Sequence, residues 1–212
     1  CSSDLSRVGG GLGYKAPTIF TEESEKIIYQ DVLPITRGRN TLERSYGVNG
    51  DINYKTTFAD HKISFSANQL FFYTRLNSPL ILSKLGNGKY LFENRPEHME
   101  SEGAETNVKI GYKHFKLFLG YTYTHSHIHK DDYYSETPLT PLHHTNSVLM
   151  YEVEGKLKLG LEGYYYSPQY LSDGARGRDY WLCGFMAEKI WQKISIYINF
   201  ENMLDSRQTR FD

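Results

Sequence analysis

Short and long connections alternate along this chain, and the segments between them alternate apolar with polar residues. Tight turns are expected at 59–62, 114–115, 155–156 and 191–192, and long connections at about 15–41, 77–97, 130–142 and 168–177. A β-barrel that crosses an outer membrane has short turns on its periplasmic rim and long loops outside. This one pattern therefore predicts fold, location and sidedness together.

Nine strands are predicted from the alternation. In 42–58, for example, Tyr46, Val48 and Ile52 share one face, and Asn49 and Asp51 share the other. The predicted strands are 6–14, 42–58, 63–76, 104–113, 116–128, 144–154, 156–166, 179–190 and 193–202. Most have the roughly 9 to 11 residues that cross a bilayer on a tilt. We predict an all-β chain, a partial transmembrane antiparallel β-barrel with its apolar face outward and its polar face inward.

Composition supports this fold and excludes other classes. The chain has 18 Tyr, 11 Phe and 2 Trp among its 212 residues, which suits strands and the aromatic belts at membrane interfaces. A formal net charge of −1 provides no basic field to attract nucleic acid. No apolar run approaches the roughly 18 residues that would indicate a membrane-spanning helix.

The strand count predicts an incomplete barrel. Single-chain bacterial barrels have an even number of strands and must close, because lipid cannot satisfy an open edge. We therefore expect at least one strand after Asp212 and others before Leu5. The opening CSSDL matches a translated sequencing-adapter fragment and lacks the features of a signal peptide. We expect residues 1–5 to be an assembly artefact and 6–212 to be part of a barrel.

Three segments resemble the carboxy-terminal barrel half of TonB-dependent outer-membrane receptors, especially those of Bacteroidetes type. They are RVGGGLGYKAPTIFTEESE, LERSYGVNGDINYKTTF and INFENMLDSRQTRFD, and they occur in the family's order. The most specific match resembles the family's Asn-Leu-Phe-Asp signature at the end of the penultimate strand, and consists of Glu201, Asn202, Met203, Leu204 and Asp205. Met203 and Leu204 stand where Leu and Phe are usual.

This resemblance implies a barrel of about 22 strands whose lumen holds an amino-terminal plug. It also implies TonB-powered uptake of a scarce nutrient across the outer membrane of a Gram-negative bacterium. An iron-siderophore ligand is the first expectation, with haem, cobalamin or a glycan as others. The expected partners are outer-membrane lipid, the small-molecule ligand, and TonB through a plug region that this chain lacks. No catalytic residue and no cofactor are expected.

Aromatic and cationic side chains in or beside the long connections are candidates for ligand contact. Their rings can stack on a siderophore or haem, and guanidinium groups can pair with its carboxylates. The candidates are Tyr90, Phe92, Arg95, Tyr133, Tyr134, Tyr170 and Arg176. The same residues also suit girdle and loop packing, an interpretation that the interfacial preference of tyrosine favours.

Three histidines in THSHIHKDD, namely His125, His127 and His129, share one strand face. Imidazoles two residues apart on a strand can converge on a metal ion. The alternation places them on the outward face, above the membrane, with Leu117 and Leu119. We favour a solvated extension of the strand and assign no metal site.

Charged residues repeat along several strand faces, and these are Glu152, Glu154, Glu162, Glu188, Glu201, Lys156, Lys158 and Lys189. We interpret them as charge ladders facing the lumen, in preference to acid and base pairs of an enzyme. Two other classes stay open. One is an outer-membrane porin or barrel enzyme without a plug, and the other is a soluble lipocalin-like binder, whose strand faces would be reversed.

Overall fold

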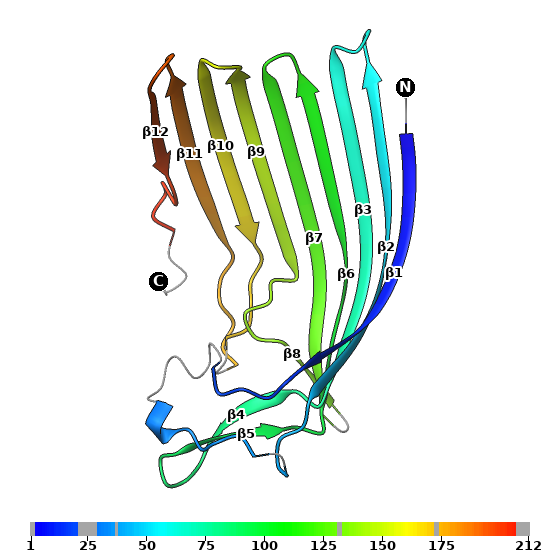
Figure 1. Cartoon of the computed structure of the whole chain (residues 1–212), viewed down its shortest axis with the longest axis vertical. Helices are drawn as coiled ribbons and strands as arrows, with labels where there is room; N and C mark the ends of the chain where they lie inside the picture. Colours follow the sequence, from blue (N-terminus) through cyan, green and yellow to red (C-terminus); the bar gives the residue numbers. More distant parts are fainter. Residues whose placement is uncertain (1–2, 21–28, 37, 131–132, 172–173, 207–212) are drawn as a thin grey trace.

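The computed structural model describes residues 3–20, 29–36, 38–130, 133–171 and 174–206. Nine strands form one antiparallel wall in sequence order, and all but the last, which has six residues, have ten or more residues (Figure 1). They are β1 (Ser3–Lys15), β2 (Glu43–Phe58), β3 (Ile63–Asn77), β6 (His98–Tyr112), β7 (Phe115–Lys130), β9 (His143–Val153), β10 (Leu157–Tyr166), β11 (Tyr180–Ile190) and β12 (Ser195–Phe200). The predicted nine strands are confirmed. In the described part of the chain, no helix is long and apolar enough to cross a membrane.

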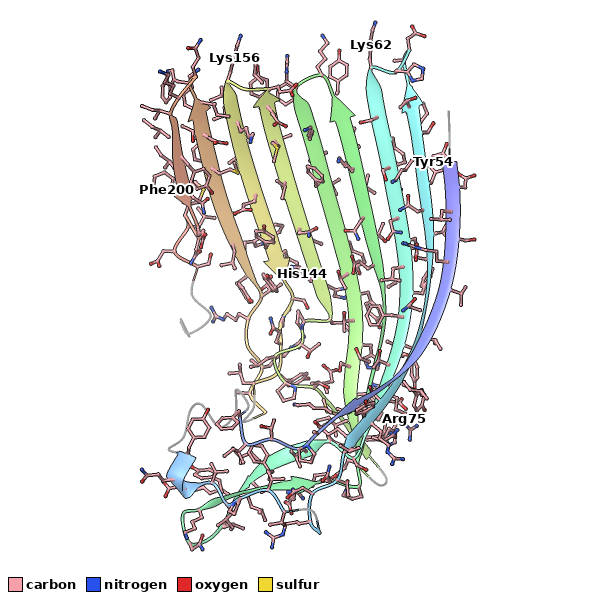
Figure 2. The ribbon with its side chains drawn as sticks, in the orientation of Figure 1. Tyr54, Lys62, Arg75, His144, Lys156 and Phe200 are labelled. Atoms are coloured by element: carbon pink, nitrogen blue, oxygen red, sulfur yellow. The ribbon has the colours of Figure 1, made fainter. Side chains whose placement is uncertain are left out.

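The tight turns all lie at one end of this wall, at the top of Figure 1, and Lys62 and Lys156 mark two of them in Figure 2. Ala59, Asp60 and His61 take positive φ angles of 51°, 53° and 67° to reverse the chain between β2 and β3. Between β6 and β7 the turn is Lys113 and His114, one residue earlier than predicted. Such a shift changes which residues of the two strands face each other.

The long connections contain three short strands that the sequence pattern does not predict. β4 (Leu80–Lys84) and β5 (Tyr90–Asn94) form a separate two-stranded sheet, and β8 (Tyr133–Glu136) extends the wall by pairing with β7. A single 3₁₀ turn, η1 (Tyr29–Asp31), lies in the first long connection. These elements gather at the end of the wall opposite the tight turns (Figure 1). A sequence signal was present for the hairpin, because Asn-Gly favours tight hairpin turns and Gly88 has a φ of 82°.

The two faces of the wall differ as predicted. On the apolar face Val108 of β6 lies between Ala67 of β3 and Leu119 of β7. The polar face carries Ser66, Asn68, Asn107, Lys109 and Asn146 around a recess of about 260 Å³, which is also lined by Val108, Phe118, Leu119 and Val148. The polar face therefore corresponds to a barrel lumen and the apolar face to lipid, which is the reverse of a soluble lipocalin-like barrel.

Ion pairs cross between neighbouring strands on the polar face. Arg7 pairs with Asp51 at 2.9 Å, and Lys116 pairs with Glu152 at 2.6 Å. Lys158 and Glu188 lie 3.3 Å apart, as the predicted charge ladder requires. Pairs as solvated as these contribute little to stability, because water screens the attraction between the two charges.

The predicted ladder is wrong at three residues. Glu154 and Lys156 lie in the tight turn between β9 and β10 and not on a strand face. Lys189 lies opposite Leu157 and Ile196, on the apolar face. Strand alternation makes this necessary, because Glu188 next to it faces the lumen. The Lys189 ammonium lies 6.0 Å from the centroid of the Trp191 ring, at the tight-turn end of the wall.

Aromatic contacts on the apolar face lie near both ends of the strands. At the tight-turn end, Phe115 and Tyr151 have ring centroids 5.0 Å apart. Toward the other end, Tyr165 and Trp181 are 5.1 Å apart. Two bands of this kind match the aromatic girdles of membrane barrels, where a ring lies in lipid and a polar atom reaches water.

The opening residues differ from expectation in one respect. β1 begins at Ser3, which lies opposite Lys55, so Ser3, Asp4 and Leu5 extend the strand that was predicted to begin at residue 6. Cys1 lies outside the described residues. The adapter origin of residues 1–5 stays a prediction.

The signature segment forms a closed turn directly after β12. Asn202 has a φ of 48°, and its side-chain amide makes two hydrogen bonds with the backbone of Ser206. Nδ2 donates to the Ser206 carbonyl at 3.0 Å, and Oδ1 accepts from the Ser206 amide at 2.9 Å. The Met203 amide donates to the Cys183 carbonyl at 2.8 Å, which fastens the turn to β11. Asparagine suits this position because it tolerates positive φ and mimics a backbone turn.

We expect Leu149→Arg to destabilise the protein in lipid vesicles by about 2–4 kcal/mol, because Leu149 is near the middle of β9 and faces lipid between Leu117 and Leu161. The adjacent Val148→Arg provides a control at the same depth. Val148 faces the lumen opposite Glu162, so its replacement costs little. Denaturant unfolding of the intact protein in phosphatidylcholine vesicles measures both, and equal losses would contradict the assignment of faces.

We expect Asn202→Ala to destabilise the turn by about 1–3 kcal/mol, because it removes two hydrogen bonds to Ser206 at a positive-φ position. Hydrogen exchange at the Ser206 amide should accelerate accordingly. Asn199→Ala is the matched control, because it removes only a solvent-exposed bond from Asn199 to Glu201. Unchanged protection of Ser206 in Asn202→Ala would show that the side chain does not hold the turn.

Candidate ligand-binding site

A recess of about 630 Å³ opens at the loop end of the wall, beside β8. It brings together two of the predicted contact residues, Tyr134 and Tyr170, from segments far apart in sequence. The lining residues are Ile128, Tyr134, Ser135, Glu136, Pro138, Tyr170, Leu171 and Gly174. Apolar and aromatic surface with a few polar groups is the usual composition of a small-molecule site.

Backbone hydrogen bonds hold the strand-free segment that carries Tyr170. The Tyr170 carbonyl accepts from the Leu139 amide at 2.8 Å, and the Gln169 carbonyl accepts from the Gly177 amide at 2.7 Å. Tyr170 also forms an isolated antiparallel bridge with Arg176, which is exposed. The structure thus places Tyr134, Tyr170 and Arg176 in one region.

The remaining candidates lie elsewhere in the loops. Phe92 lies in β5 and is only 1 % exposed, which explains it as a packing residue. The guanidinium of Arg95 pairs with Glu93 at 2.8 Å and donates to Ser83 at 3.0 Å. Tyr90 pairs with Lys84 across the hairpin, and Tyr133 begins β8 opposite Lys130. Ligand contact by any of the seven candidates stays a prediction.

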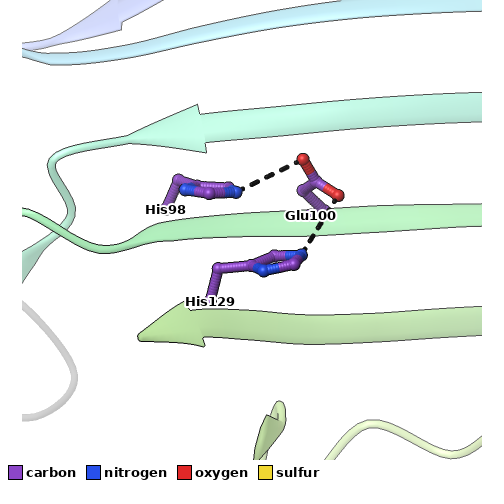
Figure 3. A group of neighbouring side chains, drawn as sticks. All are labelled: His98, Glu100 and His129. Carbon is purple, nitrogen blue, oxygen red and sulfur yellow. Dashed lines mark ion pairs between the residues drawn. The ribbon is translucent and has the colours of Figure 1, made fainter. Parts of the chain in front are cut away.

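The three predicted histidines lie on the outer extension of β7, and β6 places further ligand-type residues opposite them. His98 faces His129, Glu100 faces His127, and Glu102 faces His125. Figure 3 shows His98, Glu100 and His129 converging from the two strands. The Nε2 atoms of His127 and His129 are 3.0 Å apart. His125 faces Glu102 instead, with its Nδ1 3.5 Å from the carboxylate.

Sequence reasoning missed His98 and Glu100, which complete this cluster. The position of the β6–β7 turn decides which residues of β6 lie opposite the three histidines, so a correctly placed turn would have identified His98 and Glu100. With the predicted turn at His114 and Phe115, Glu102 would lie opposite His127; with the observed turn, Glu100 does. The cluster lies more than ten residues from that turn, and is therefore beyond the membrane-spanning part of both strands.

Glu100 is the centre of a polar network. Its Oε1 accepts hydrogen bonds from the Tyr73 hydroxyl at 3.0 Å and from Arg75 at 3.1 Å. Burial raises the pKa of this carboxyl group, but the Tyr73 hydrogen bond and the charge of Arg75 outweigh burial and lower the pKa below its usual value. Burial, and then the charge of Arg75, lowers the pKa of His98. At neutral pH the network therefore contains a carboxylate and a neutral His98 imidazole.

Comparisons with solved structures identify the fold. The chain superposes on the ferric-catecholate import receptor Fiu of E. coli K12 (TM-score 0.61, 15% identity, 96% of this chain and 29% of that chain). It also matches the copper transporter OprC with a TM-score of 0.68 and 14% identity, over 97% of this chain and 32% of that chain. A third match is the ferripyoverdine receptor of the outer membrane of Pseudomonas aeruginosa, with a TM-score of 0.52 and 18% identity over 77% of this chain and 24% of that chain.

These matches extend over a quarter to a third of the length of the solved chains. No protein-family model and no curated protein matches this sequence. At these identities the comparisons show the fold alone, and they confirm the partial antiparallel β-barrel that the strand alternation predicts. The chain has the fold of part of the β-barrel wall of outer-membrane receptors.

Proposed function

We propose that this chain forms part of the barrel of a TonB-dependent receptor in the outer membrane of a Gram-negative bacterium, and that its role is non-catalytic. The observation that carries this proposal is the division of the wall into an apolar outer face and a polar face, with an aromatic recess at the loop end. Capture of a ligand at the outer rim and passage along a polar lumen require this arrangement. The wall and its loops supply the conduit and the first contacts.

The proposed cargo is an iron-siderophore complex. Support comes from solved neighbours described as a ferric-catecholate import receptor and a ferripyoverdine receptor. Within this chain, Tyr134 and Tyr170 offer rings for stacking on an aromatic chelate, and Arg176 beside Tyr170 offers a cation for its negative charge. Haem, cobalamin and glycans are the other cargo classes of the same proposal.

Two further elements of the proposal rest on the family resemblance. Energy would come from TonB acting on an amino-terminal plug, and the Bacteroidetes type follows from the three quoted segments. The polar face of the wall suits a plug, because Asn68, Asn107 and Lys109 line its recess with hydrogen-bonding groups. Reading the coding sequence upstream for a plug and a TonB box tests this part directly.

We expect the intact protein in detergent to bind one of four probes saturably: a ferric tris-catecholate complex, a ferric hydroxamate, haem or cobalamin. Tyr170→Ala should then weaken binding by about tenfold, since truncating a central aromatic contact costs more than about 1 kcal/mol. Calorimetric titration measures both affinities. Tyr112→Ala is the matched control, because Tyr112 lies at the tight-turn end and faces lipid.

Two outcomes would contradict the proposal. Equal loss of affinity in Tyr112→Ala and Tyr170→Ala would remove the recess from the ligand site. Absence of binding to all four probes and to an oligosaccharide, together with steady ion conductance through planar bilayers containing the intact protein, would favour a porin without a plug.

A further inference from the structure

We propose that Glu100, His127 and His129 form a binding site for one divalent transition-metal ion, Zn²⁺ first, on the outward face of the wall beyond the membrane. The site is built from β6 and β7, and His98 stands beside it. This inference is independent of the transported ligand, because the cluster lies on the face opposite the lumen.

The separations among the three donor atoms fit zinc. The Nε2 atoms of His127 and His129 are 3.0 Å apart. Glu100 Oε2 lies 3.5 Å from the first and 3.6 Å from the second. Three atoms with these separations lie on a circle of radius about 2.0 Å, and zinc takes ligands at about 2.0–2.2 Å. Tetrahedral bonds of about 2.05 Å place ligand atoms about 3.4 Å apart, close to the three observed values.

The two oxygens of Glu100 have separate roles. Tyr73 and Arg75 donate to Oε1, and Oε2 faces the two imidazoles. Metal-ligating carboxylates are commonly held by hydrogen bonds of this kind, which fix their orientation. The side chains of Glu100 and His127 are only 17% and 11% exposed, so the donors are partly shielded from water.

His98 packs against the site and is not one of its ligands, because an ion lies near the plane of each imidazole that binds it and the stacked rings of His98 and His129 share no such position. The His98 ring stacks on His129 with centroids 4.5 Å apart, and its Nε2 lies 3.5 Å from Glu100 Oε1. The donor atoms of His98, Glu100 and His129 all lie within 4.8 Å of one another (Figure 3). Imidazole nitrogen with one carboxylate selects zinc, copper or nickel over magnesium and calcium, which prefer oxygen ligands.

The short contact between His127 and His129 has one other explanation. A single N–H···N hydrogen bond between neutral imidazoles also gives a separation of 3.0 Å. The two explanations differ in what they predict for added metal. A hydrogen-bonded pair alone gives no saturable zinc binding, whereas the proposed site binds one ion and ties β6 to β7.

Calorimetric titration of the intact protein in detergent with ZnCl₂, after chelator treatment, tests the site. We expect one ion per chain with a dissociation constant on the order of 1 µM or tighter. Glu100→Gln, His127→Gln and His129→Gln should each weaken binding by about 100-fold. His125→Gln is the matched control on the same strand and face, because its imidazole turns to Glu102, and its affinity should stay within about twofold.

Thermal unfolding with and without zinc gives a second measurement in case a variant folds poorly. His129 is the most exposed of the three ligands, with a side chain 38% exposed, so His129→Gln is the variant least able to disturb packing. Zinc should raise the thermal unfolding temperature of the wild type and of His125→Gln, but not that of His129→Gln. Bound Co²⁺ should give the intense visible absorption of a four-coordinate ion. Absence of saturable zinc binding in the wild type, or equal loss in His125→Gln, would overturn the proposal.

Discussion

Backbone hydrogen bonding in a medium without water is the constraint on which this structure depends. Within lipid every amide and carbonyl needs a partner in the protein, so long strands must lie beside one another and pair along their length. The nine strands do so in sequence order, with β2 and β3 paired from Arg44 to Phe58. Once the backbone is fixed in this way, each side chain points either to lipid or to lumen. The apolar outer face, the polar inner face and the cross-strand ion pairs all follow from that choice.

The same constraint explains how much of the fold the sequence predicts. Where both faces have strict demands, alternation is regular, and the predicted strand 144–154 differs from β9 by one residue at each end. Where the wall leaves the membrane, neither face has to be apolar, and the alternation of apolar and polar residues disappears. β6 was predicted to begin at residue 104 but begins at His98, because HMESEG carries polar residues on both faces. The strand continues there on backbone pairing with β3 and β7, which sequence periodicity does not reveal.

The candidate sites were less predictable than the wall for two physical reasons. Contacts across a hairpin depend on the turn, and an error of one residue between β6 and β7 moves Glu100 away from His127 and hides the cluster. Contacts between loops depend on where the chain reverses direction, and these reversals leave no periodic pattern in the sequence. The recess joins Tyr134 to Tyr170 through backbone bonds such as Leu139 to Tyr170, which no spacing in the sequence indicates. Residue types suggested candidates, but only the three-dimensional arrangement separates Phe92, a packing residue, from the exposed Arg176.

Beyond the membrane the side chains of the outer rim no longer contact lipid, so polar ligand-binding groups can lie there on either face of the wall. On the outward face of β6, Val108 lies within the membrane and Glu100 lies beyond it. Burying a carboxylate and imidazoles in lipid at the depth of Val108 would be unfavourable. At the rim the same groups are near water, and the paired strands still hold them in place. Donor atoms on paired strands are held at nearly fixed separations, as a metal ion requires. The recess at Tyr170 is built from loops, whose side chains can adjust to the shape of a larger ligand. The paired strands therefore suit the ion, and the loops suit the nutrient.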